Sequence, residues 1–145
     1  METALDVVRQ AYDAFGRGDV AALVALIAPE VDWECVVPVH WPYAGRRRTP
    51  QQVADFFTDL SQAEDVHAFE PREFLEAGEH VTVLGWERTT AVATQKTYES
   101  QWVQVFTVKE GKITRWRHFF DTAARYGSAT EGSPEIATRN ARPDV

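Results

Sequence analysis

Residues 113–121 carry two ionisable side chains among large apolar ones, so chemistry could take place there. Their content of Trp, Phe and Thr is typical of a β-strand. Counting by twos along such a strand, Trp116, His118 and Phe120 share one face. A histidine there titrates near neutral pH and can act as a general acid or base. The alternative is a buried, hydrogen-bonded histidine with only a structural role.

Asp121, near the end of this strand, is a second acid/base candidate. It has the opposite parity to His118, on the face that carries Arg115 and Arg117. It could equally be a solvated carboxylate, or pair with one of these arginines. Tyr12 is a third candidate because it falls on the apolar face of a predicted helix, where a buried hydroxyl needs a hydrogen-bond partner. It would either reach a cavity or be a core tyrosine bonded to a backbone carbonyl.

Helical periodicity dominates the first third of the chain. The apolar positions of the first helix are Leu5, Val8, Tyr12 and Phe15. Thr3 and Asp6 predict a capping box at its start. Asp19 predicts the N-cap of a second helix, whose apolar set runs from Val20 to Ile27 and which Pro29 ends.

Residues 31–37 alternate as a strand does, with Val31, Trp33 and Cys35 on one face. Residues 38–48 read as a loop, which contains His40, Trp41 and Tyr43. A third helix is predicted from Thr49, a plausible N-cap, with Pro50 at its first position and Gln52 able to reach back. Its apolar stripe is Val53, Phe56, Phe57 and Leu60.

After Asp65 the period changes from helix to strand. Four strands are predicted, at residues 67–77 with an interruption at Pro71, 80–94, 98–109 and 112–122. Glu110 and Gly111 supply the last turn. Helices followed by antiparallel strands predict an α+β fold with the helices on one face of a curved sheet. We expect one domain over residues 1–127 and a loose polar tail over 128–145.

Composition excludes several classes of function. The 145 residues suit one domain, and a net charge of −7 argues against nucleic acid as a partner. The single cysteine, Cys35, rules out an intrachain disulfide. The four histidines lack metal-motif spacing, and no glycine-rich phosphate loop is present, so we expect neither metal nor cofactor. Without a signal peptide or a long apolar run, we expect a cytoplasmic protein with no membrane partner.

The order of elements, with four local strings, resembles the nuclear transport factor 2-like fold, and more narrowly its SnoaL-like and ketosteroid-isomerase-like group. The strings are FGRGD at 15–19, APEVDW at 28–33, YAGR at 43–46 and ITRWRHFFDT at 113–122. The resemblance covers residues 3–125. It implies a cone-shaped sheet that, with three N-terminal helices, encloses an apolar pocket. The group includes isomerases, polyketide cyclases, epoxide hydrolases, dehydratases and non-catalytic binders.

The family's catalytic positions carry different residues here. The proton-moving carboxylate of ketosteroid isomerases falls at Cys35, whose neutral thiol is a poor general base. Their oxyanion-hole acid falls at Gln104, which can donate an amide N–H, and their tyrosine at Ala11, beside Tyr12. The two aspartates of limonene-epoxide-hydrolase-like members fall at Gln104 and His118. The last-strand carboxylate of the polyketide cyclases leaves His118 and Asp121 as candidates.

The resemblance therefore implies a small cofactor-independent enzyme that transfers protons on an apolar or aromatic small molecule, as an isomerase, cyclase or hydratase/dehydratase. The alternatives are a non-catalytic ligand-binding or accessory protein and a structural dimer module. The expected catalytic residues are His118, Asp121, Tyr12 and Gln104. The expected ligand-binding residues are Trp33, Cys35, Tyr43, Trp86, Trp102, Trp116 and Phe120. We also expect a homodimer through the sheet face with Val103, Val105, Arg115 and Arg117, which mixes apolar and charged residues as interfaces do.

Overall fold

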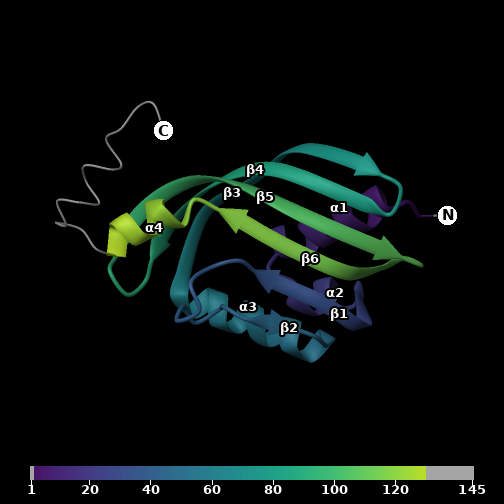
Figure 1. The fold of residues 1–145 in the computed structure, drawn as a ribbon, viewed down its shortest axis with the longest axis horizontal. Helices are drawn as coiled ribbons and strands as arrows, with labels where there is room; N and C mark the ends of the chain where they lie inside the picture. The colour runs from purple at the N-terminus through teal and green to yellow at the C-terminus, as the bar shows by residue number, and fades with distance from the viewer. Residues whose placement is uncertain (1, 130–145) are drawn as a thin grey trace.

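A curved six-stranded sheet arches over three helices in the computed structural model, which describes residues 2–129 (Figure 1). The three helices are α1 (Ala4–Gly16), α2 (Val20–Val24) and α3 (Pro50–Ala63), and a fourth helix, α4 (Thr122–Ala129), follows the last strand. The strands are β1 (Ile27–Cys35), β2 (Arg46–Arg47), β3 (Glu64–Ala77), β4 (His80–Ala91), β5 (Lys96–Lys109) and β6 (Lys112–Phe120). They lie in the order β2-β1-β6-β5-β4-β3, and all pairs are antiparallel except β1 with β6. The predicted α+β class and curved, mostly antiparallel sheet are confirmed.

The predicted helix starts are confirmed by their caps. Thr3 and Asp6 form the capping box of α1, and Asp19 caps α2 by accepting from the Ala22 N–H. Thr49 caps α3, with Pro50 in its first turn. Gln52 does reach back, but its side chain accepts from the N–H of Arg48, one residue before the cap.

The second helix is shorter than predicted, because β1 begins at Ile27 instead of after Pro29. Ile27 pairs with Ile113 of β6, so its apolar side chain belongs to the sheet. The register shifts between Ile27 and Asp32, and this irregularity accommodates Pro29, since a strand tolerates proline at a bulge. The loop at 38–48 likewise contains a two-residue strand, β2, which pairs with β1.

The four strands after α3 form successive hairpins as predicted. Glu110 and Gly111 both have positive φ, 51° and 77°, as the tight turn between β5 and β6 requires. Pro71 again coincides with a register shift. The last strand ends at Phe120 and not at residue 122, because Asp121 starts α4 by accepting from the Ala123 N–H. The predicted tail would thus begin inside α4, and most of it lies outside the described residues.

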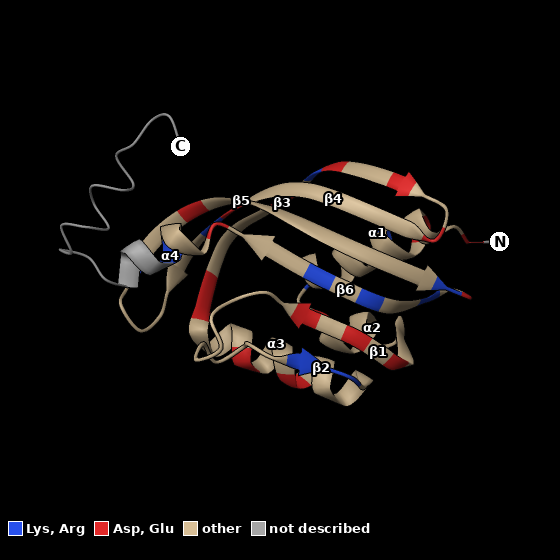
Figure 2. Ribbon diagram, in the orientation of Figure 1, with Lys and Arg blue, Asp and Glu red and all other residues tan. Residues whose placement is uncertain are grey.

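Strand register places one row of side chains across the concave face. Val83 of β4 faces Gln104 of β5, which faces His118 of β6, which in turn faces Cys35 of β1. On the convex face of β6, the Arg117 side chain instead points toward the neighbouring strand β1. Its guanidinium lies 2.7 Å from the Asp32 carboxylate, among the acidic residues of β1 seen beside β6 (Figure 2). None of the helices within residues 2–129 has the length and apolar character needed to cross a membrane.

Candidate functional site

A cavity of about 80 Å³ lies between the concave face of the sheet and helices α1 and α3. A single water needs roughly 10–15 Å³ by the same measure, so a small organic molecule fits. Eight of the predicted site residues line it: Tyr12, Trp33, Cys35, Tyr43, Gln104, Trp116, His118 and Phe120. Most of the other lining side chains are Phe, Leu and Val. The cavity is therefore an aromatic chamber with a few polar groups, as small-molecule sites are.

Three predicted site residues do not line the cavity. Asp121 is exposed at the start of α4, which removes the basis for its acid/base role. Trp86 lies on the convex face, where the Arg72 guanidinium sits 5.1 Å from its ring centre. Trp102 is fully buried but stacks on Phe69, 4.5 Å away, behind the wall. Its ring occupies the space above Gly85, where an added Cβ would lie 2.2 Å from it.

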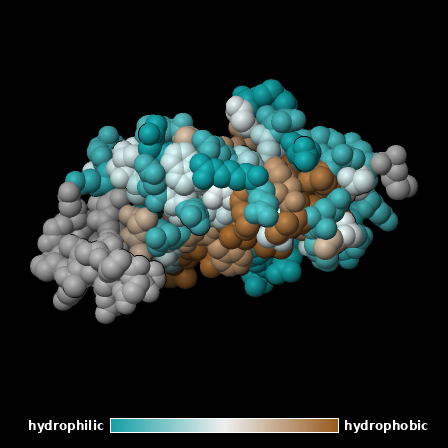
Figure 3. Space-filling model, turned by 90° about the horizontal axis from the view of Figure 1, so that it is seen from above, coloured by the Kyte–Doolittle hydropathy of each residue, from teal (hydrophilic) through white to brown (hydrophobic). Residues whose placement is uncertain are grey.

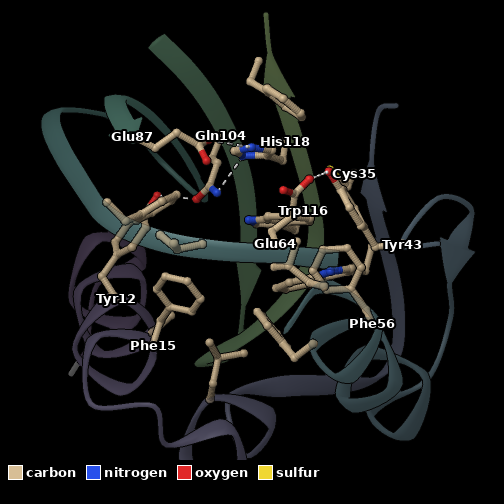
Figure 4. A pocket seen from close by; sticks show the side chains of 18 of the residues that line it. Tyr12, Phe15, Cys35, Tyr43, Phe56, Glu64, Glu87, Gln104, Trp116 and His118 are labelled. Atoms are coloured by element: carbon tan, nitrogen blue, oxygen red, sulfur yellow. Dashed lines mark hydrogen bonds and ion pairs between the residues drawn. The ribbon is translucent and has the colours of Figure 1, made fainter. Parts of the chain in front are cut away.

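A chain of hydrogen bonds joins Tyr12, Gln104 and His118 across the cavity (Figure 4). The Tyr12 hydroxyl donates to Gln104 Oε1 at 2.6 Å, which turns the amide nitrogen toward His118. That nitrogen lies 2.8 Å from His118 Nδ1. Because an amide nitrogen can only donate, Nδ1 must accept, and the imidazole proton must sit on Nε2. His118 thus presents an N–H donor.

Burial sets the charge of His118. The ring lies face to face with Trp116, with centroids 5.6 Å apart. Loss of water lowers the pKa of His118 to about 3, because desolvation disfavours the imidazolium. The expectation that this histidine titrates near neutral pH is therefore wrong. His118 is neutral at pH 7, and its Nε2–H is available as a hydrogen-bond donor.

Glu87 is the ionisable group that sequence reasoning missed. Its carboxyl lines the cavity, and Oε2 lies 3.8 Å from Nε2 of His118. Burial raises the pKa of Glu87 to about 7, partly opposed by a 2.8 Å hydrogen bond from the Thr89 hydroxyl. A carboxyl with such a pKa exchanges protons readily at neutral pH. Strand parity was the available signal, since Glu87 has the same parity as the buried Val81 and Val83 and so lies on the same face of β4.

A second buried carboxylate, Glu64, lines another part of the cavity and was also missed. Its Oε1 accepts from the Tyr43 hydroxyl at 2.6 Å and from the guanidinium of Arg125. Arg125 comes from α4 and lies 4.3 Å above the Trp41 ring. Burial raises the pKa of Glu64, while Tyr43 and Arg125 stabilise its anion. Because α4 was not predicted, this long-range pair had no signal in the sequence.

The remaining polar groups of the cavity stay protonated at neutral pH. Burial raises the pKa of the Cys35 thiol and of the Tyr12 and Tyr43 hydroxyls. Cys35 is therefore neither a base nor a nucleophile there. Residues 2–129 contain no cluster of three or more His, Cys, Asp or Glu side chains suited to a metal ion.

The raised pKa of Glu87 predicts a pH-dependent stability. Between pH 4.5 and 7 the unfolded carboxyl ionises while the folded one holds its proton, so the native state loses stability as pH rises. Relative to Glu87→Gln, which cannot titrate, the wild type should lose about 3 kcal/mol over this range. Urea unfolding from pH 4.5 to 8.5 would measure the difference, with exposed Glu99→Gln as control. A difference that stays constant with pH would contradict the shift.

Comparison with known proteins identifies the family. The family model of the SnoaL-like domain matches residues 8–116. An uncharacterized protein of Mycobacterium tuberculosis is 32% identical over 121 residues, 83% of this chain and 91% of the relative. An NTF2-like protein of Burkholderia thailandensis has a TM-score of 0.81 and 29% identity, covering 90% of this chain and 99% of its own.

More distant structures share the fold. TerC, crystallised with polyporic acid, has a TM-score of 0.74 at 23% identity and covers 85% of this chain and 95% of its own. A Catenulispora acidiphila protein with a ketosteroid isomerase-like fold, in complex with trimethylamine, has a TM-score of 0.69 at 13% identity, covering 82% and 88%. The family match and the first relative show that this chain belongs to the SnoaL-like domain family, within the NTF2-like fold.

Proposed function

We propose that the protein is a cofactor-independent enzyme that moves a proton on a small aromatic molecule, as an isomerase, cyclase or dehydratase does. One observation carries this proposal: Glu87 is a buried carboxyl with a pKa of about 7 that faces an apolar cavity. A general base works best when its pKa is near the working pH. Glu87 therefore takes the acid/base role that the sequence suggested for His118.

The neighbouring histidine supplies the complementary group. Nε2–H of His118 lies 3.8 Å from Glu87 Oε2, so a C–H next to a carbonyl can face Glu87 while the carbonyl oxygen faces His118. Glu87 removes the proton from carbon, and the electron pair moves onto the carbonyl oxygen as an enolate. The N–H of His118, held by Gln104 and Tyr12, stabilises that developing charge. Glu87 then returns the proton at another position.

The walls favour a flat, apolar substrate. Trp33 and Trp116 stack 4.1 Å apart, and the edges of Phe56 and Phe57 pack against Trp33. Aromatic surfaces of this kind bind planar rings by burial and stacking. Burial in the same mostly apolar cavity desolvates Glu87 and raises its pKa.

Proton transfer can be tested on a model ketone. In D₂O at neutral pD, the hydrogens on the carbons next to the carbonyl of 2-indanone exchange with deuterium, and their proton NMR signal disappears. The wild type should accelerate this exchange. Glu87→Gln should lower this catalysed exchange by roughly 10²–10⁴-fold, the usual worth of general base catalysis. Glu99→Gln, on the exposed side of β5, should exchange like the wild type.

Two outcomes would contradict the proposed function. Equal rates for wild type and Glu87→Gln, with both proteins folded, would mean that Glu87 is not the base. Binding of 2-indanone in the cavity without faster exchange would instead support the non-catalytic binder.

We also propose a homodimer through the convex face of the sheet. By strand parity the convex face carries half-buried Leu84, Val103 and Val105 with exposed Phe119. Apolar side chains also gather on part of the surface seen from above in Figure 3. Arg117 is not free to bind a partner because Asp32 and Glu34 hold it within the chain. Sedimentation at micromolar concentration that finds only the 16.4 kDa species would contradict the dimer.

A further inference from the structure

One oxygen of Glu64 has no hydrogen-bond partner. The Tyr43 hydroxyl and the Arg125 guanidinium both donate to Oε1. Oε2 receives no hydrogen bond, although it is buried and the side chain is only 2% exposed. The hydroxyl of Tyr98 lies close enough to affect the Glu64 carboxyl, but it does not donate to Oε2. A buried acceptor without a donor costs roughly 1–3 kcal/mol.

The position of Glu64 suggests what would donate to it. The residue lines the cavity, and Figure 4 shows its carboxylate in the same space as His118 and Trp116. It pairs with Ala91 on β4, four residues beyond Glu87 along the same strand. A ligand that reaches Glu64 can therefore also extend toward Glu87.

Charge decides the kind of donor. Arg125 already compensates the negative charge of Glu64, and Trp41 holds that guanidinium in place at 4.3 Å. A second cation would meet a neutralised pair and lose its own hydration, so a neutral donor is favoured. The surrounding rings of Tyr43, Tyr98 and Phe120 suit an aromatic group. A hydroxyl on an aromatic ring meets both conditions.

We infer that Oε2 of Glu64 is the binding site for the hydroxyl of a phenolic substrate. The hydroxyl donates to Oε2, and the ring lies among the aromatic side chains with its far side directed toward Glu87 and His118. The inference rests on the proposed function only in that both use the same cavity. It adds a substrate class and a recognition residue to the reaction.

Binding of small fluorinated rings tests the inference by ¹⁹F NMR. The ligands are 4-fluorophenol and 4-fluorotoluene, which are similar in shape but differ in the hydroxyl. The quantity compared is the ratio of their dissociation constants, because hydration of the ligands cancels when the ratio is compared between proteins. Glu64→Gln presents an amide N–H in place of the free oxygen. The preference for the phenol should fall roughly tenfold in this variant, the worth of one hydrogen bond to a charged acceptor.

Glu99→Gln is the matched control, since Glu99 is an exposed carboxyl of β5 and its loss should leave the ratio within about twofold of the wild type. If Glu64→Gln does not fold because Arg125 loses its partner, Glu64→Gln/Arg125→Met removes the buried charge and should show the same loss of preference. An unchanged ratio in the folded Glu64 variants, or an equally large change in Glu99→Gln, would overturn the inference. Because binding is read without turnover, failure of the exchange experiment would leave this result intact.

Discussion

The chemistry of the candidate site depends on one electrostatic constraint, a carboxyl group, that of Glu87, kept in a water-poor aromatic cavity without a cation beside it. Among the described residues, Arg125 forms an ion pair with Glu64 and His118 is neutral, so Glu87 has no positively charged partner. Desolvation then raises its pKa to about 7. The same dryness removes the charge from His118 and keeps the thiol of Cys35 protonated. A single physical cause, desolvation, thus sets the protonation states on which the proposed roles of Glu87 and His118 depend.

Strand register brings these groups together. The tight turn at Glu110 and Gly111 sets β6 against β5 so that His118 faces Gln104. A slip of one residue would turn both side chains to the convex face, since strand side chains alternate. Tyr12 on α1 completes the chain from the opposite layer, so the site requires the helices and the sheet to be packed together. Arg125 of α4 adds a long-range pair with Glu64 at the start of β3.

Much of this could be predicted from alternation and capping. The period of two placed Trp116, His118 and Phe120 on the inner face, and the capping residues located the starts of three helices. Alternation along β4 places Glu87 inside and Trp86 outside, whereas the hydrophobicity of Trp86 alone predicted that it lines the cavity. The charge state of His118 and the role of Glu64 depend on burial and on a helix after β6. No local pattern reports these, because both arise from contacts between distant segments.

The most direct measurement is the titration of Glu87 itself. Protein labelled with ¹³C at the glutamate side-chain carboxyl can be followed by NMR from pH 3 to 9, with Glu87→Gln identifying the resonance. We predict that Glu87 titrates with a midpoint near 7. A midpoint near the ordinary glutamate value of about 4.3 would contradict it, because the cavity would then be wet or charged enough to hold a carboxylate.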